Sequence, residues 1–422
     1  MSIKSPVTIE LALTHDCNHR CVHCYNPDRT APISVSLSDD VFNDRVDSII
    51  EDLIKNEVFK VIITGGEPLT HPKRTIDIVK KLSDNNIFCS INTNSTLLTE
   101  TFLEQIAMVK KAPSLFISLP SYNESECEHI TQTIGSFQKI HNSIEMCDKY
   151  HLNVGINTVY SKLVGLDYAD IDCFLKCHPN INYVSISPAV PPEYSLSRPD
   201  FNVDSAMMNK LTRTLLWIKQ NYKMPVGSTI PLPLCIVGFD SVLHNGTSMC
   251  SAGRTHCTID VELGKIFACA QSFFEGFDLN LGIQNAWAQM GKWRDKTLLH
   301  PTCVDCPALS LCSGLCRKYD YQHLPFTPKH INISSNSLEH NEIKLIDKTY
   351  IFNSDTRLRS ENFGGTVFIY NKYFFLAPAA YTLVQHMSKM EKFTLSDIKE
   401  FVTYNDAFKK LFFELIEAEV IT

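Results

Sequence analysis

Long apolar runs and an excess of positive charge are both missing from this 422-residue sequence. No stretch approaches the roughly 20 uninterrupted apolar residues that a membrane-spanning helix needs. The first residues, MSIKSPVTIELALTHDC, lack the basic start and apolar core of a secretory signal peptide, and their alternation predicts a strand. The formal charge of −7 argues against a nucleic-acid partner, because phosphate binding needs a basic surface. We therefore expect a cytoplasmic protein with no membrane and no nucleic-acid partner.

Cysteine, in contrast, is abundant. Three of the sixteen cysteines fall within residues 17–24 and seven within 250–316. In a reducing compartment such clusters indicate metal sites before disulfides. For five of the six other cysteines we expect buried free thiols in helices or strands; these are Cys89, Cys127, Cys147, Cys173 and Cys177.

The first half of the chain has a strand–helix rhythm up to about residue 225. Apolar residues recur at helical spacing over 40–55, between two short β-rich runs. The predicted strands are Thr8–Leu13, Phe59–Thr64, Phe88–Asn92, Leu115–Ser118, Asn153–Thr158 and Tyr183–Ser187. Six such units predict an α/β fold with a parallel sheet, either open or part of a (β/α) barrel.

The remainder of the chain divides at changes of composition. The rhythm is lost over 226–245, and cysteine spacing dominates 250–316, where we expect hairpins and loops organised by metal. The polar stretch 330–341 predicts a linker. Beyond it, the sequence predicts a hairpin followed by helices, with bounds Thr366–Tyr370, Tyr373–Leu376, Pro378–Lys389, Leu395–Thr403 and Asp406–Ala418. The expected domains are thus 1–225, 226–330 and 341–422.

The first cysteine cluster has the spacing CX3CX2C, formed by Cys17, Cys21 and Cys24 directly after the first strand. Thiolates suit iron–sulfur clusters, and three of them leave one iron of a [4Fe–4S] cube open for a small molecule. A structural zinc site is the alternative, because His15, His19 and His23 are near in sequence. The position at a strand end within βα units favours the cluster.

With the motif Gly65-Gly66-Glu67-Pro68 after the second strand, the chain resembles the radical S-adenosylmethionine (SAM) superfamily. The resemblance implies a [4Fe–4S] cluster on the three cysteines, a partial (β/α)6 TIM barrel, and an electron donor such as flavodoxin or ferredoxin. It also implies cofactor contacts by the GGEP residues, by His23 within the cysteine motif, and by polar residues at strand ends. On physical grounds, two glycines let a backbone approach a ligand closely, and a carboxylate suits an ammonium group. The strand-end candidates are Asn94, Ser118 and Asn157; Ser95 stands where the family often has glycine.

A second resemblance is to the SPASM auxiliary-cluster domain. Its spacing CX9–15GX4C is matched by Cys250, Gly264 and Cys269, and its spacing CX2CX5CX3C is matched over 303–316. The resemblance implies one auxiliary cluster on Cys250, Cys257, Cys269 and Cys316. It implies another on Cys303, Cys306, Cys312 and one later cysteine.

That later cysteine is missing from the sequence, which has none after Cys316. Cys235, Asp320 or His323 could supply the fourth ligand, or the site could be open. An open iron could hold a substrate thiolate, whereas a closed cluster would suit electron transfer.

The C-terminal residues are similar to the small winged-helix recognition elements of peptide-maturation systems, relatives of the chaperone from pyrroloquinoline quinone biosynthesis. The match rests on Phe363-Gly364-Gly365 and the order of elements after it. It implies a winged-helix-like α+β module that captures a leader peptide as an added strand. A structural cap is the main alternative.

Together these features predict a peptide maturase whose partner is a precursor peptide with a leader. Hydrogen abstraction from the peptide would lead to cross-linking, oxidation or epimerisation. The alternatives are a sulfatase-maturating type of enzyme and a zinc-organised binding protein without catalytic activity. The sequence identifies no catalytic acid or base.

Overall fold

The computed structural model describes residues 3–25, 37–190, 199–238, 249–272, 275–318, 324, 326–330, 345–346 and 348–422. The chain forms two compact units. One contains residues 5–333, and the other contains residues 334–422 together with residues 1–4.

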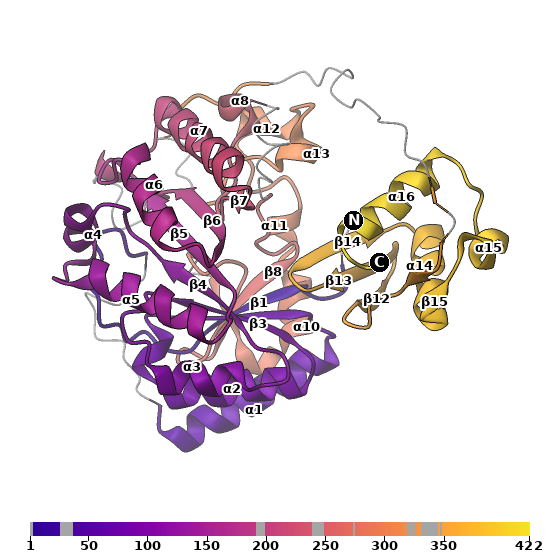
Figure 1. Ribbon diagram of the computed structural model, residues 1–422, viewed down its shortest axis with the longest axis horizontal. Helices are drawn as coiled ribbons and strands as arrows, with labels where there is room; N and C mark the ends of the chain where they lie inside the picture. Colours follow the sequence, from indigo (N-terminus) through magenta and orange to yellow (C-terminus); the bar gives the residue numbers. More distant parts are fainter. Residues whose placement is uncertain are drawn as a thin grey trace. The chain divides into compact units, whose positions relative to one another are not determined.

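A parallel sheet with outer helices forms the larger unit (Figure 1). Strands and helices alternate along the chain, as the sequence predicts. The strands are β1 Thr8–Ala12, β2 Lys60–Thr64, β3 Phe88–Thr93, β4 Ser114–Ser118, β5 Val154–Tyr160, β6 Ile181–Pro188 and β7 Val226–Gly227. The helices are α1 Asp39–Lys55, α2 Pro72–Asp84, α3 Glu100–Ala107, α4 Glu124–Thr131, α5 Ser136–Lys149, α6 Tyr168–Cys177 and α7 Ser205–Tyr222.

Helix α1 illustrates how the sequence determines these elements. The Ser38 side chain caps it by accepting a hydrogen bond from the Val41 N–H. Its apolar residues at helical spacing are all buried, as predicted: Phe42, Val46, Ile49, Ile50 and Leu53. Burying this face is the main stabilising contribution, because most of the stability of a helix in a protein comes from tertiary packing of its amphipathic face.

The auxiliary region extends the barrel sheet instead of forming a separate one. Among the described residues the strand order is β10-β9-β8-β1-β2-β3-β4-β5-β6-β7, and β8 lies parallel to β1 with Ala12 opposite Asp260. The elements here are α8 Leu234–Val237, β8 His256–Asp260, β9 Lys265–Phe267, β10 Phe277–Asp278, α10 Ile283–Gln289, α11 Gly291–Arg294, α12 Pro301–Val304 and α13 Leu309–Cys312. The barrel and the auxiliary cysteines therefore share one compact unit.

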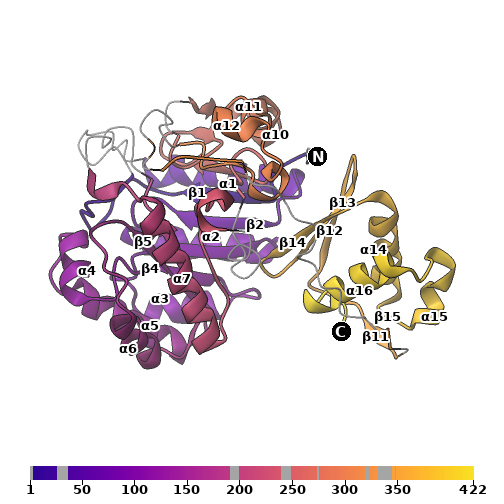
Figure 2. The same ribbon diagram turned by 90° about the horizontal axis from the view of Figure 1, so that it is seen from above.

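The C-terminal unit is a small α+β module (Figure 2). Its strands β12, β13 and β14 form an antiparallel sheet, and helix α14 packs on β13. The bounds are β11 Tyr350–Ile351, β12 Arg357–Glu361, β13 Gly364–Ile369, β14 Lys372–Leu376, α14 Pro378–Met390, β15 Lys392–Phe393, α15 Leu395–Ile398 and α16 Asp406–Glu417. Strands β11, β12 and β15 were not predicted, and the helix expected over 395–403 is α15 followed by the 3-10 turn Lys399–Phe401.

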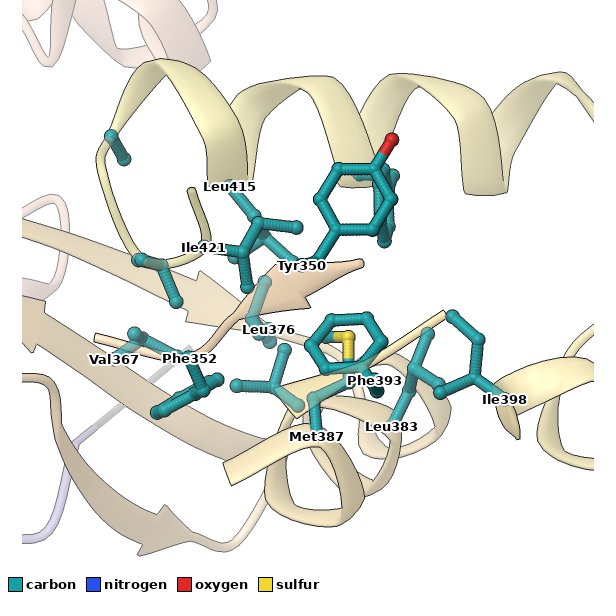
Figure 3. Close-up of a cluster of buried hydrophobic side chains, with 14 of the residues drawn as sticks. Tyr350, Phe352, Val367, Leu376, Leu383, Met387, Phe393, Ile398, Leu415 and Ile421 are labelled. Atoms are coloured by element: carbon teal, nitrogen blue, oxygen red, sulfur yellow. The ribbon is translucent and has the colours of Figure 1, made fainter. Parts of the chain in front are cut away.

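The module has a core of its own (Figure 3). Apolar side chains from the sheet meet those from the helices, so that Val367 and Leu376 lie near Met387 and Leu415. Gly365 is required by this packing, because a Cβ there would lie 2.1 Å from the Tyr381 ring. The Phe-Gly-Gly step therefore has a structural role in this chain. The relation to peptide-recognition elements stays a prediction.

The expectation for the scattered cysteines is confirmed in part. Cys89, Cys127 and Cys147 are buried, but Cys173 and Cys177 are exposed on α6. The prediction was wrong for these two because α6 buries a different face, formed by Ile171, Phe174 and Leu175. In the part of the chain that the structure describes, no helix combines the length and apolarity needed to cross a bilayer.

Candidate active site

The first cysteine cluster lies on the loop that leaves β1. Two main-chain bonds fix this loop to the end of α4: Arg20 N–H donates to Thr131 O (3.2 Å) and Val22 N–H donates to Ile130 O (2.9 Å). The Cys17 sulfur accepts from the His19 N–H at 3.4 Å and from the Asn94 side-chain amide at 3.9 Å.

The two glycines of GGEP bring the loop after β2 against the loop that carries the cysteines. Gly66 N–H donates to Thr14 O at 2.6 Å, and Glu67 N–H donates to Asp16 O at 2.7 Å. A Cβ on Gly66 would lie 2.2 Å from Asp16 O, and one on Gly65, at φ +144°, would lie 2.4 Å from Thr14 O. No side chain fits at either position. Both glycines therefore allow a close approach to the protein's own backbone, and not only to a ligand as the sequence suggests.

The Glu67 carboxylate is buried and takes hydrogen bonds from three protein donors. One oxygen accepts from Leu69 N–H (3.0 Å) and the Thr93 hydroxyl (2.7 Å), and the other accepts from Asn94 N–H (2.7 Å). Burial raises the pKa of Glu67 to about 7, although these hydrogen bonds act in the opposite direction. The carboxylate thus joins the loops after β2 and β3 and holds Asn94, whose side chain contacts Cys17. Its predicted contact with an ammonium group stays a prediction.

Ser95 has the backbone conformation that explains why glycine suits this position. Its φ is +61° in the left-handed region, its side chain is fully buried, and its hydroxyl has no hydrogen-bond partner in the structure. The residue therefore carries both backbone strain and an unsatisfied buried donor.

The other predicted cofactor residues lie in different places at the same edge of the sheet. Ser118 is exposed at the end of β4. Asn157 on β5 accepts from the Ser187 hydroxyl at 3.3 Å. Pro68 is buried at the start of the 3-10 turn Pro68–Thr70, and His23 is half-buried between two of the cluster cysteines. The structure leaves the cofactor contacts of these four residues as predictions.

Two of the three histidines proposed for a zinc site are engaged elsewhere. His15 Nε2 lies 2.8 Å from Asp260, and buried His19 has its Nε2 3.2 Å from the Thr96 hydroxyl. Among the described residues, no group of three or more His, Cys, Asp or Glu side chains forms a site for a single metal ion. An iron–sulfur cube holds its thiolates farther apart than one ion does, and the all-sulfur donor set of the loop fits it.

The auxiliary cysteines form two groups in the structure. In the first group, burial raises the pKa of Cys316 to about 12 and also raises the pKa of Cys269. The charge of Cys250 raises both pKa values further, and the charge of Cys316 raises the pKa of Cys269. These three thiols are therefore close enough to interact. Cys257, on β8, has a pKa raised by burial, and its charged neighbour is Arg294. The structure thus groups three of the four residues expected for the first auxiliary cluster.

The second group contains a residue from outside the cysteine-rich region. Burial raises the pKa of Cys303 to about 11, and charges on Cys312, Cys235 and Cys306 raise it further. Three of these four match the predicted set, and Cys235 joins them from α8. Asp320 and His323, the other candidates for the fourth ligand, lie outside the described residues.

A small pocket is lined by residues of the cluster loop and by residues near the first auxiliary group. It is lined by alternate residues of β1 and β8, including Glu10, Thr258 and Asp260, and by Tyr25 and Gly65. Burial raises the pKa of Tyr25, and Glu10, Cys24 and Cys269 add to the shift. Tyr25 therefore lies within electrostatic reach of one thiol of the cluster loop, Cys24, and one thiol of the first auxiliary group, Cys269.

Sequence reasoning did not find this pocket. The signal is Glu10, a charged residue in the middle of a strand, because a carboxylate at such a position needs a polar partner. In the structure Glu10 pairs with His256 at 3.3 Å.

Comparison with known proteins gives a family match for part of the chain. Residues 11–175 match the model of the radical SAM superfamily. The GTP 3′,8-cyclase of Clostridium perfringens strain 13 is 29% identical over 178 residues, or 39% of this chain and 51% of the relative. The subtilosin biosynthesis protein AlbA of Bacillus subtilis is 27% identical over 154 residues, or 36% of this chain and 32% of the relative. The chain spans about half the length of the first curated relatives that it matches.

Solved structures show the same fold at low identity. Streptococcus suis SuiB bound to its precursor peptide SuiA gives a TM-score of 0.58 at 17% identity and covers 75% of each chain. The enzyme anSMEcpe, bound to AdoMet and a peptide, gives 0.53 at 16% identity and covers 74% of this chain and 90% of the other.

Proposed function

Residues 11–175 form a radical SAM domain, and from that premise we propose that this chain is a cytoplasmic, anaerobic enzyme that modifies a ribosomally made peptide. When bound, the cluster and S-adenosylmethionine supply a 5′-deoxyadenosyl radical that abstracts hydrogen from an unactivated C–H bond. Cross-linking, oxidation or epimerisation of the peptide would follow.

The chain's own residues position the chemistry. Cys17, Cys21 and Cys24 would hold three irons of the cluster and leave the fourth for the amino and carboxylate groups of S-adenosylmethionine. Asn94 orients Cys17 through the amide contact, and Glu67 fixes Asn94 through its main-chain N–H. This rigid support matters because small displacements of reacting groups are costly in rate.

One observation carries the proposal. Two further groups of cysteines lie in the same compact unit as the cluster loop, and Tyr25 lies within electrostatic reach of thiols from the loop and from the first of these groups. Auxiliary clusters at these positions would accept an electron from a substrate radical formed in the adjoining pocket. Oxidative modification of a peptide needs such an acceptor.

A peptide substrate is supported by two independent features. SuiB shares the fold and is described with a precursor peptide bound, and AlbA is a bacteriocin biosynthesis protein. In addition, β14 is an edge strand in the described sheet of the C-terminal module, and Tyr373 and Phe375 on it are 38% and 39% exposed. Such an edge suits an added strand from a leader peptide, with pairing by the main chain and selectivity from the aromatic side chains.

Anaerobic reconstitution tests the proposal. The full chain should bind about twelve irons, three clusters of four each. With dithionite and S-adenosylmethionine it should form 5′-deoxyadenosine. A precursor peptide encoded beside this chain's gene should be altered only in the complete reaction, with a change of mass for cross-linking or oxidation and a change of residue configuration for epimerisation. The matched control is the Cys17→Ala/Cys21→Ala/Cys24→Ala variant, which should keep its auxiliary iron and form no 5′-deoxyadenosine.

The alternatives have distinct outcomes in the same experiment. Zinc without iron–sulfur absorption would support the binding protein and end the enzyme proposal. Turnover of GTP in place of a peptide would support a cyclase like the Clostridium perfringens relative. Modification of a sulfatase-derived peptide that lacks a leader would support the sulfatase-maturating alternative.

A further inference from the structure

The short helix α8, Leu234–Val237, brings a cysteine to the second auxiliary group from a distant part of the chain. Leu234 is buried, and its main-chain N–H donates a hydrogen bond to the thiol of Cys312 at the end of α13. Figure 1 shows the labels of α8, α12 and α13 at the same end of the unit, in agreement with this contact. Cys235 is thus the residue next to one that touches Cys312 directly.

Helix α8 is held by packing against α7 and by its own main-chain hydrogen bonds. It packs against α7, and Pro233 begins it, with the Ile236 and Val237 N–H groups donating to Pro233 O at 2.9 and 3.1 Å. Leu234 and Val237 are buried, while Cys235 is half-buried. The side chain of Cys235 therefore projects from a firmly held backbone and is not itself part of the packed apolar face.

The surroundings of Cys235 are thiols. It is among the electrostatic neighbours of both Cys303 and Cys312, and Cys306 is the other thiol that acts on both. All four are free cysteines in the structure. These four thiols come from three separate short segments. Such a set suits an iron–sulfur cluster, because binding to iron offsets the repulsion between neighbouring thiolates.

We propose that Cys235 supplies the fourth thiolate of the second auxiliary cluster, together with Cys303, Cys306 and Cys312. Cys235 would thus take the place of the later cysteine that the sequence lacks. The assignment rests on the proposed function, because it requires that the chain holds auxiliary clusters. A cluster with four protein thiolates has no iron free for a substrate atom. The second auxiliary cluster therefore transfers electrons, and the substrate is held elsewhere.

Spectroscopy of the full chain tests this without enzyme activity. The Cys17→Ala/Cys21→Ala/Cys24→Ala background removes the radical cluster and leaves about eight irons per chain. In that background, Cys235→Ala should leave one cluster with three thiolates, which loses iron on mild oxidation and gives the EPR signal of an oxidised three-iron cluster. Cys235→Ser should keep more iron and alter the EPR spectrum, because its oxygen is a weaker ligand. Cys177→Ala, a change at an exposed cysteine on α6, is the matched control and should match the background in iron and EPR.

A small thiol gives a second readout. Added 2-mercaptoethanol should shift the EPR spectrum of the reduced Cys235→Ala protein, where one iron is open, and should leave the background protein unchanged. Iron content and spectra equal to the background in both Cys235 variants would overturn the assignment. Loss of iron in Asp320→Ala or His323→Ala, with Cys235→Ala unaffected, would assign the ligand to that residue instead. A background protein without any iron–sulfur signal would contradict the proposed function itself, so the two failures are distinguishable.

Discussion

Glu67 is the residue at which two physical effects oppose each other most directly. Its carboxylate is 1% exposed, and burial disfavours its charge, whereas hydrogen bonds from Leu69, Thr93 and Asn94 favour it. The pKa of Glu67 is raised from 4.5 to about 7, so burial is the stronger effect. The neutral form is then preferred in the folded protein, and the stability that this group contributes is present below pH 4.5 and lost as the pH rises towards 7.

Glu67→Gln removes the titration while keeping the shape of the side chain. From the two pKa values, ionisation of Glu67 costs roughly 2 kcal/mol of folding free energy at pH 6 and roughly 3 kcal/mol at pH 8. The wild-type free energy of unfolding, measured relative to that of the variant, should therefore fall by about 1 kcal/mol between pH 6 and pH 8. Any constant effect of the amide on the three hydrogen bonds cancels in this comparison.

Urea unfolding of both proteins at pH 6, 7 and 8, followed by circular dichroism under anaerobic conditions, measures the difference. Glu51→Gln, at an exposed position on α1, is the control and should show no such trend. A difference between wild type and Glu67→Gln that rises with pH would refute the reasoning. It would mean that three donors outweigh burial and that the carboxylate is held as an anion.

Three further predictions concern the cluster loop, the turn after β3 and the C-terminal module. Gly66→Ala should lower the iron content by about four per chain and leave the auxiliary clusters in place, because the added Cβ would displace the backbone that supports the cysteine loop. Iron analysis with EPR measures this, and full iron loading would contradict it. Ser95→Gly should raise the free energy of unfolding by about 1 kcal/mol. Removing the left-handed backbone strain and the unsatisfied buried hydroxyl should outweigh the entropy cost of glycine. Unchanged or lower stability in urea would refute this. Tyr373→Ser/Phe375→Ser should weaken precursor-peptide binding by about tenfold in calorimetry, through loss of aromatic contact area, while Phe413→Ser, an exposed aromatic on α16, should leave it unchanged.

The barrel could be predicted from sequence because its strands are buried runs separated by amphipathic helices. Strand β3, for example, begins at Phe88 as predicted and ends at Thr93, one residue later than predicted. The auxiliary strands could not be predicted in this way. Strand β8 has the polar residues Thr258 and Asp260 on the face that lines the pocket, and β9 and β10 are too short to show a period.

The parts of the site that sequence spacing missed depend on pairing between distant segments. Glu10 and Asp260 meet in one pocket because β1 and β8 lie parallel in register, although about 250 residues separate them. Cys235 was one of three candidates for the fourth ligand, and it lies near the other thiols through the packing of α8, which motif spacing does not report. Spacing within a motif reports local geometry, whereas these contacts arise from the tertiary fold.

The GGEP motif shows how a correct prediction can rest on an incomplete physical reason. Glycines at 65 and 66 were expected to admit a ligand, but in the structure they admit the backbone of Thr14 and Asp16, immediately before the first cluster cysteine. The segment before the cysteine motif and the GGEP segment are thus in direct main-chain contact. This contact is a physical reason why the two motifs occur together. The available space distinguishes Gly66 from Ser95. That position requires only a positive φ, a strain that serine can bear, whereas Gly66 has no room for a single additional carbon.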